Sequence, residues 1–250
     1  MNLLEPGETP AENAQFLLFL CAVIQAVDDY QDMLRISVAS AANDHRLGAN
    51  EAPPAVVSMY VGDEIENILD AIVNETSYAG QEKELLKIGV HALPRFPKDT
   101  TDRNRTSPFA FTGNRFEFRA VGSSDNCADA MLTLNTAVAE QLTRFKEAVD
   151  RHIESGMKKE KAIYEELKKL IRECKPIHFD GNGYSDEWKA EAARRGLDCE
   201  TSTPLIFDRY LTADSIRMFE STGVLNKVEI EARTEVKWET YTKKLSLIHI

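Results

Sequence analysis

The sequence predicts an α+β fold whose strands lie in its first half and whose second half is helical. Residues 55–61 and 109–120 are rich in the β-branched and aromatic side chains that favour strands. From about Ala128 onward, apolar residues recur at helical spacing and strand signals fade. With 250 residues, of which 43% are hydrophobic and 28% charged, the chain has a globular composition and enough length for one large domain or a domain with an appendage.

The first elements are predicted to be helices followed by a polar loop. Residues 9–12, Thr-Pro-Ala-Glu, form a capping box with proline at the first helical position, so a helix is expected to begin there. It should continue through residues 16–27, which are apolar on nearly all sides, and we therefore expect it to be buried. A second helical piece over 30–42 should lead into a polar loop over 43–54 that two prolines stop.

A strand, a helix and a hairpin are expected next. Residues 55–61 predict a buried strand, and residues 63–73 have the apolar spacing of a helix. Aromatic residues over 109–111 and 116–120 predict two strands, which the turn at 112–114 would join.

Alternation gives the second strand of this hairpin two unlike faces. It places Arg115, Glu117 and Arg119 on one face, opposite Phe116 and Phe118. Without a ligand such a row could be an ion-paired sheet face. Alternatively, the arginines hold anions, because their planar fork binds phosphate or carboxylate bidentately, and the glutamate holds a hard cation such as Mg²⁺. Periodicity alone leaves both interpretations open.

The second half is predicted to be a succession of helices. They cover residues 128–149, 158–174, 184–195 and 212–242, the last with a break near Gly223. The helix over 158–174 is charged and amphipathic, so a solvated face or a contact between subunits is expected there.

Charge and hydropathy exclude several classes of partner. The 41 acidic and 30 basic side chains give a formal net charge of −11, which disfavours nucleic acid and anionic membrane surfaces. The longest apolar run, residues 16–24, is far shorter than the roughly 20 residues that span a bilayer. No secretory leader pattern is present at the N-terminus, so a cytoplasmic location is expected. The four cysteines are widely spaced without a C-x-x-C pair, which predicts reduced structural thiols: Cys21, Cys127, Cys174 and Cys199.

Several motifs carry a resemblance to a known family. Residues 104–107, Asn-Arg-Thr-Ser, followed by Arg115-x-Glu117-x-Arg119, resemble the N-R-[ST] and R-[IFL]-E-[FV]-R pair of the glutamine synthetase superfamily. The insertion at 108–114 resembles the type III form, as do residues 43–54, Asn-Asp-His-Arg-Leu-Gly-Ala-Asn-Glu-Ala-Pro-Pro, and residues 2–7, Asn-Leu-Leu-Glu-Pro-Gly. Because the likeness runs from residue 1 to about 244, the chain resembles a C-terminal catalytic fragment of a type III glutamine synthetase.

The resemblance implies an architecture. The family fold is a curved antiparallel sheet backed by helices, here with an added helical C-terminal region. Residues 1–150 would be the C-terminal part of the catalytic domain and residues 151–244 the helical region. The last residues, 245–250, fit nothing before them and resemble a translated sequencing-library adapter, so we expect them to be non-native. The full-length protein would be a ring-like homo-oligomer.

The resemblance also implies a reaction. In this family ATP phosphorylates the γ-carboxylate of glutamate, and ammonia then displaces phosphate from γ-glutamyl phosphate, with Mg²⁺ or Mn²⁺ present. Glu51, in the E-A-P motif, resembles the mobile glutamate that binds ammonium, deprotonates it and shields the intermediate from water. A carboxylate suits this role because it attracts the cation and accepts its proton.

The remaining roles follow from the resemblance residue by residue. Arg105 and Arg115 resemble the arginines that hold the transferring phosphoryl group and stabilise charge on its oxygens. Glu117 resembles a metal ligand near the nucleotide, and Arg119 resembles the clamp on substrate glutamate. Arg46 lies close to another substrate-side arginine of the family, although its spacing to Glu51 is one residue shorter than in the commoner bacterial type.

Two departures limit what the chain is expected to do alone. Asp129-Ala130-Met131 stands where relatives often have Asn-Pro. In the family, most metal carboxylates, a metal histidine and a substrate loop precede the Asn-Leu-Leu-Glu-Pro-Gly motif, so the isolated chain is expected to be inactive.

Two other classes of function stay open. A related γ-glutamyl ligase would use an amine other than ammonia, whereas the E-A-P loop favours ammonia. An assembly or nitrogen-sensing protein without catalysis would be expected to have lost Glu51, Arg105 or Glu117, and all three are present.

Overall fold

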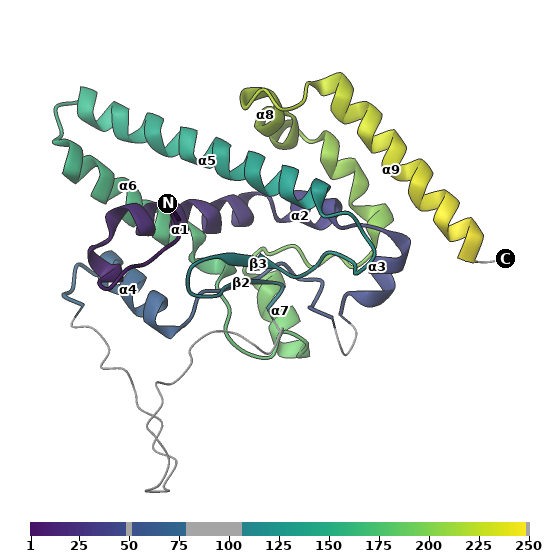
Figure 1. Ribbon diagram of the computed structural model, residues 1–250, viewed down its shortest axis with the longest axis horizontal. Coiled ribbons are helices and arrows are strands. Elements are labelled where there is room, and N and C mark those ends of the chain that lie inside the picture. Colours follow the sequence, from purple (N-terminus) through teal and green to yellow (C-terminus); the bar gives the residue numbers. More distant parts are fainter. Residues whose placement is uncertain (49–51, 79–106, 249–250) are drawn as a thin grey trace, which may run out of the picture.

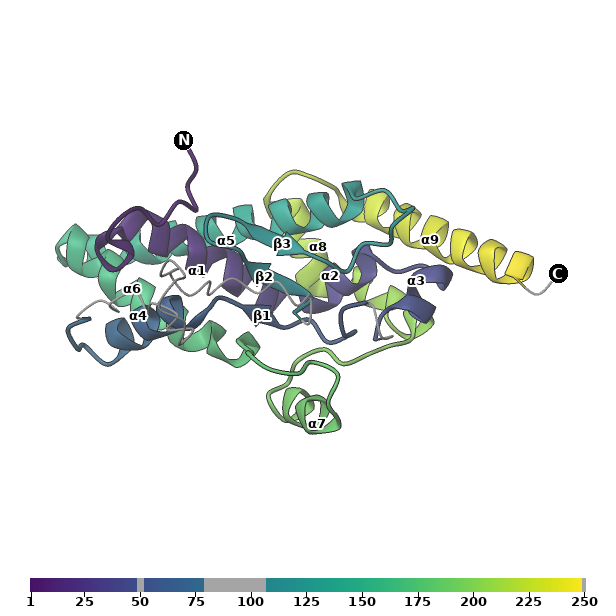
Figure 2. The same cartoon turned by 60° about the horizontal axis from the view of Figure 1, so that its bottom comes forward.

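The computed structural model describes residues 1–48, 52–78 and 107–248, and it is mainly helical with one small sheet. In both Figure 1 and Figure 2 the sheet lies between α1 and α5 on one side and α7 on the other. The elements of the first half are η1 (Pro10–Glu12), α1 (Ala14–Asp29), α2 (Gln31–Ser37), α3 (Ala41–Arg46), β1 (Met59–Tyr60), α4 (Asp63–Val73), β2 (Phe109–Phe111) and β3 (Phe116–Phe118).

The second half is helical, as predicted. Its elements are α5 (Ala128–Glu154), α6 (Lys159–Cys174), η2 (Lys175–Ile177), α7 (Asp186–Arg194), η3 (Thr203–Leu205), η4 (Phe207–Leu211), α8 (Ala213–Ser221) and α9 (Lys227–Ile248). Gly223, at φ 69°, provides the expected break between α8 and α9. In both views α9 lies at the opposite end of the molecule from α6.

The first helix begins later than the capping box predicts. Thr9 makes no side-chain cap hydrogen bond, and residues 10–12 form only a 3₁₀ turn. Asn13 caps α1 instead, because its side-chain oxygen accepts a hydrogen bond from the amide of Phe16 at 3.0 Å. As expected, α1 is buried along most of its length, including Leu20 and Ile24.

The second predicted helix is divided in two. Ser40 accepts a hydrogen bond from the amide of Asn43 and so begins a new helix, α3, after the short break at residues 38–40. Residues 43–46, which were expected to be loop, are therefore helical. They carry Arg46 at the last position of α3.

The sheet is mixed rather than wholly antiparallel. β2 and β3 form the predicted antiparallel hairpin, with Ala110 opposite Glu117. β1 pairs with β2 in parallel, because the connection between them is long and contains α4, and parallel neighbours need such a crossover. Of the strand predicted over 55–61, only Met59–Tyr60 forms.

Two large apolar clusters form the core. The first joins the sheet to α1, α4, α5, α6 and α7, and includes Phe109 and Trp188. The second joins α2 and α5 to η4, α8 and α9, and includes Phe207 and Phe219. No helix among the described residues is long and apolar enough to cross a membrane.

The four cysteines, all within the described residues, form no disulfide. Cys21 and Cys174 are buried, and burial raises the pKa of Cys21 to about 12. The burial of Cys21 and Cys174 agrees with the predicted structural role for these two thiols, whereas Cys127 is exposed and Cys199 is half-buried.

Candidate functional site

β3 has the two faces that its alternation predicts. The Phe116 and Phe118 rings pack against the first cluster, with centroids 5.5 and 5.4 Å from that of Phe109. The hairpin is closed by a hydrogen bond from the amide of Thr112 to the carbonyl of Arg115. Aromatic packing therefore fixes the strand on one face and leaves the other face to charged residues.

On the charged face, two arginines share one carboxylate. We call Arg115, Glu117 and Arg119 the β3 row. Arg115 Nη2 lies 3.4 Å from Glu117 Oε1, and Arg119 Nη2 lies 3.2 Å from Glu117 Oε2. Without a ligand the row is thus an ion-paired sheet face, one of the two interpretations that the sequence left open. Its formal charges do not cancel, because two guanidiniums face one carboxylate, and the excess positive charge suits an anion.

The two arginines differ in how firmly they are held. The side chain of Arg115 is 71% exposed and that of Arg119 only 13%. Arg119 also points Nη1 toward the carbonyl of Ser107 at 3.5 Å, and its amide donates to the carbonyl of Pro108. Arg115 can therefore turn toward a ligand at little cost, whereas Arg119 is fixed in place.

Arg46 lies at the end of β3 and binds its backbone. Its Nη1 donates to the carbonyl of Ala120 at 3.2 Å, and its Nη2 lies 3.4 Å from the carbonyl of Arg119. Nη1 also donates to Asn43 Oδ1 at 2.9 Å. The structure thus brings Arg46 to the β3 row through the main chain of Arg119.

Asn43 is a contributor that the sequence analysis missed. It is 1% exposed, and its Nδ2 donates to the carbonyls of Val38 at 2.7 Å and Ala120 at 2.9 Å. Ser40 is a favoured N-cap residue, so the sequence did contain a signal for a helix that begins just before Asn43. The sequence analysis assigned Asn43 to a loop and so gave it no role.

Glu51 and Arg105 lie outside the described residues. Glu117 and Arg119, to which the resemblance also gives roles, are described, and they lie in contact. The N-terminal segment approaches the same place, since Asn2 Nδ2 donates to the carbonyl of Asn114 at 2.7 Å, next to Arg115.

Glu117 is the candidate metal ligand. Its carboxylate is 37% exposed and offers the hard oxygen atoms that Mg²⁺ and Mn²⁺ bind. Within the described residues, no three Asp, Glu, His or Cys side chains are placed to hold a metal ion. By itself Glu117 offers one carboxylate, fewer oxygen ligands than such an ion takes.

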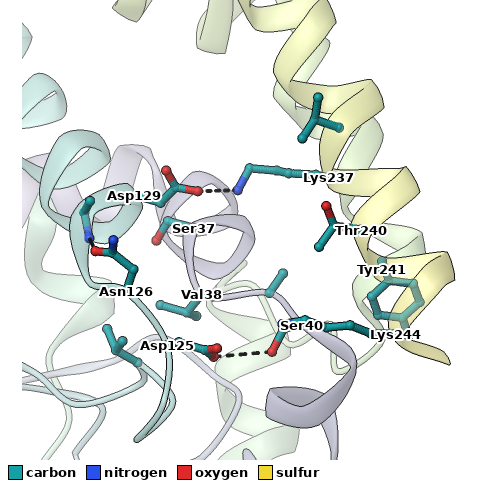
Figure 3. Close-up of a pocket in the computed structure, with 14 residues that line it drawn as sticks. Ser37, Val38, Ser40, Asp125, Asn126, Asp129, Lys237, Thr240, Tyr241 and Lys244 are labelled. Atoms are coloured by element: carbon teal, nitrogen blue, oxygen red, sulfur yellow. Dashed lines mark hydrogen bonds and ion pairs between the residues drawn. The ribbon is translucent and has the colours of Figure 1, made fainter. Parts of the chain in front are cut away.

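A cavity of about 400 Å³ lies away from the β3 row, between α9 and the segment that follows β3 (Figure 3). An ion pair of 2.7 Å between Asp129 and Lys237 crosses it, and Ser40 contacts Asp125 at 3.4 Å. Tyr241 and Lys244 of α9 line it from the other side. Its two carboxylates, Asp125 and Asp129, are matched in number by Lys237 and Lys244, so this cavity lacks the excess positive charge of the β3 row.

A second cavity is acidic. Asp28, Asp32 and Asp198 line it together with Arg209, which pairs with Asp198. Burial, with the charge of Asp29 beside it, raises the pKa of Asp28 to about 6, and burial also raises the pKa of Asp32.

Comparison with known proteins identifies relatives along nearly the whole chain. The family described as "Glutamine synthetase C-terminal domain" matches residues 162–248. A glutamine synthetase of Bacteroides fragilis is 48% identical over 250 residues, which is 99% of this chain and 34% of that protein. The type-3 glutamine synthetase of Dictyostelium discoideum is 44% identical over 98% of this chain and 33% of its own length. A glutamine synthetase of Butyrivibrio fibrisolvens is 40% identical, over 99% of this chain and 35% of its own length. The chain thus spans about a third of the length of these curated relatives.

Proposed function

We propose that this chain, as a member of the glutamine synthetase family, is part of an ATP-dependent ligase that joins glutamate and ammonium to make glutamine. Identities of 40–48% to proteins named glutamine synthetase support the proposal, although the chain covers only about a third of each. The observation that carries it in the structure is the β3 row, where two guanidiniums flank one carboxylate.

The reaction needs cationic groups at two stages. In the first, a γ-carboxylate oxygen of glutamate attacks the γ-phosphorus of ATP, and ADP leaves. In the second, ammonia attacks the carbonyl carbon of γ-glutamyl phosphate, and the carbon–oxygen bond to phosphate breaks. Both stages place negative charge on phosphoryl oxygens, which preorganised guanidiniums stabilise.

The unequal exposure of Arg115 and Arg119 suggests which part of the substrates each arginine binds. We assign Arg115, which is exposed and pairs with Glu117, to the phosphoryl oxygens, because it can follow a group that moves during transfer. We assign Arg119 to a carboxylate of substrate glutamate, since a fixed planar fork suits a group that must stay in place.

Glu117 is assigned to a divalent cation. Its oxygens are paired with the two arginines, so it would exchange one of these partners when it binds the ion. Bound Mg²⁺ or Mn²⁺ would neutralise charge on the phosphate oxygens. Freed from Glu117, a guanidinium could then turn to the substrate.

The other assignments belong to the same proposal. Arg46 would act on the substrate side, and its contact with the carbonyl of Arg119 supports this place. Glu51 would bind ammonium and take its proton, and Arg105 would help Arg115 to hold the phosphoryl group. The ring-like homo-oligomer and the cytoplasmic location also remain proposals.

The test is glutamine formation by the full-length protein. With glutamate, ammonium, ATP and Mg²⁺ we expect glutamine and phosphate in equal amounts. Arg115→Gln should lower kcat by about 100-fold or more, as loss of a transition-state donor does. Arg144→Gln is the matched control, because Arg144 is also exposed and ion-paired, with Asp29 at 2.7 Å, but lies on α5.

The outcomes separate the possibilities. Absence of glutamine formation, or equal effects of the two substitutions, would refute the proposal. Turnover with primary amines but not with ammonium would instead identify a γ-glutamyl ligase for another amine.

A further inference from the structure

One carboxylate outside the β3 row binds donors from three separate parts of the chain. Asp44, on α3, accepts hydrogen bonds from Arg35 Nη2 at 3.0 Å, the amide and hydroxyl of Thr203, and the hydroxyl of Tyr241 at 3.4 Å. Thr203 begins η3, and Tyr241 lies on α9. Asp44 therefore joins α3 to the C-terminal part of the chain.

Arg35 stabilises this contact between α3 and the C-terminal part of the chain. Its side chain is 2% exposed, and its Nη2 also donates to the carbonyl of Thr201 at 3.0 Å. Its Nε and Nη1 have no hydrogen-bond partner among the residues that the structure describes. A buried guanidinium needs a counter-charge, so the Arg35–Asp44 pair resists separation.

The other two donors are also held by packing, Thr203 more firmly than Tyr241. Thr203 is fully buried, and the ring of Tyr241 packs edge-on against Phe207, with centroids 5.8 Å apart. Figure 3 shows Tyr241 on α9 across from residues 38–40, which lead into α3. The second apolar cluster, against which Tyr241 packs, thus helps to hold the Tyr241 hydroxyl near Asp44.

The same short helix binds the end of the β3 row. Asn43 and Arg46, on either side of Asp44 in the sequence, donate to the carbonyl of Ala120, and Arg46 also reaches the carbonyl of Arg119. A small apolar cluster of Val38, Ala120 and Ala130 packs at this junction. A shift of α3 would therefore shift the backbone that carries Arg119.

We propose that Asp44 is a positioning residue for substrate glutamate. Its bonds to Thr203 and Tyr241 fix the position of α3. The bonds from Asn43 and Arg46 on α3 to the carbonyls of Ala120 and Arg119 then fix the position of Arg119. The C-terminal helix α9 thereby takes part in glutamate binding through α3. The inference rests on the proposed function and adds a role for the C-terminal region. Small displacements matter here, since about 1 Å of misplacement can cost about 100-fold in rate.

Mild substitutions in the full-length protein test this role. Asp44→Asn would leave the charge of Arg35 buried without its partner, so we choose Tyr241→Phe and Thr203→Val, which remove single hydroxyls and keep shape. Each should raise the KM for glutamate about threefold to tenfold, the effect of one hydrogen bond, with little change in the KM for ATP.

Two controls separate positioning from general stability. Thr203→Ser keeps the hydroxyl and should keep the KM for glutamate near wild type. Thr234→Val removes the hydroxyl of another buried threonine, on α9, which donates only to the carbonyl of Ile230 in its own helix. Circular dichroism melts would show that all variants are folded.

A double-mutant cycle gives the decisive measurement. If Tyr241 acts through α3, its effect on the KM for glutamate should shrink in an Arg46→Lys background. Full additivity, an equal effect on the KM for ATP, or a Thr203→Ser variant as impaired as Thr203→Val would overturn this inference alone. A wild-type protein that forms no glutamine would overturn the proposed function and this inference with it.

Discussion

Arg115 contributes little to the stability of the fold. An ion pair between exposed side chains contributes at most about 1 kcal/mol, and Arg115 is 71% exposed. The fold therefore leaves this side chain available for the ligand role proposed above. Arg35 differs from Arg115, because its side chain is buried and its ion pair with Asp44 is needed for the stability of the fold.

Asp28 gives a prediction on pH. Folding raises its pKa from 3.8 to about 6, so the native state holds the proton more tightly than the unfolded chain. Between about pH 4 and pH 6 the free energy of unfolding should therefore fall as pH rises. Asp28→Asn imitates the neutral form and can still accept from Gln31 Nε2.

We expect Asp28→Asn to raise the free energy of unfolding by about 1 kcal/mol at pH 7.5, a value reduced for partial exposure, and to have almost no effect near pH 4. Urea denaturation at both pH values measures this. A destabilised variant at pH 7.5 would contradict the assigned cause of the pKa shift.

Among the elements, α1 depends on its cap. It carries much of the first apolar cluster, and Asn13 begins it by accepting from the amide of Phe16 while its Nδ2 donates to the carbonyls of Glu5 and Pro6. The segment before α1 is thus folded back onto the start of the helix.

Asn13→Ala should lower the free energy of unfolding by about 1 kcal/mol, the usual cost of a lost N-cap. Thr9→Ala should change it by less than about 0.5 kcal/mol, because the Thr9 side chain makes no cap bond. Thermal melts of the two variants compare them directly, and equal destabilisation would count against Asn13 as the cap.

Sequence patterns correctly predicted the elements that are stabilised by residues close to them in the sequence. The helix over 63–73 matches α4 at both ends, since its apolar residues lie on one face. Thr9 and Asn13 are both acceptable caps in sequence, and only the fold chooses between them. Residues 55–58 have the composition of a strand, but pairing depends on a distant partner. The same holds for Asp44, whose donors lie far along the chain.

In the whole molecule, the two apolar clusters share helices rather than dividing the chain into separate bodies. α5 contributes Phe145 to the first cluster and Ala137 to the second. Residues 162–248, which match the glutamine synthetase C-terminal domain, are also divided, with α6 in the first cluster and α8 and α9 in the second. The C-terminal region is therefore built into the framework around β3.

We expect the 250-residue chain by itself to release no phosphate from ATP in the presence of glutamate, ammonium and Mg²⁺. In the proposed reaction the β3 row would supply one carboxylate to a divalent cation, which takes several oxygen ligands. A phosphate assay on the purified chain, with the full-length protein as positive control, measures this. Glutamate-dependent phosphate release by the chain alone would show that it holds a complete site.

The bond from Asn2 to the carbonyl of Asn114 has a practical consequence for labelling. A reporter dye or affinity tag fused before Met1 would lie near the β2–β3 turn and should hinder the approach of ligands to Arg115. The far end of α9 lies away from the hairpin in both views. A label joined there leaves the arginines accessible, so comparing the two labelled forms would report whether a ligand reaches the hairpin from the N-terminal side.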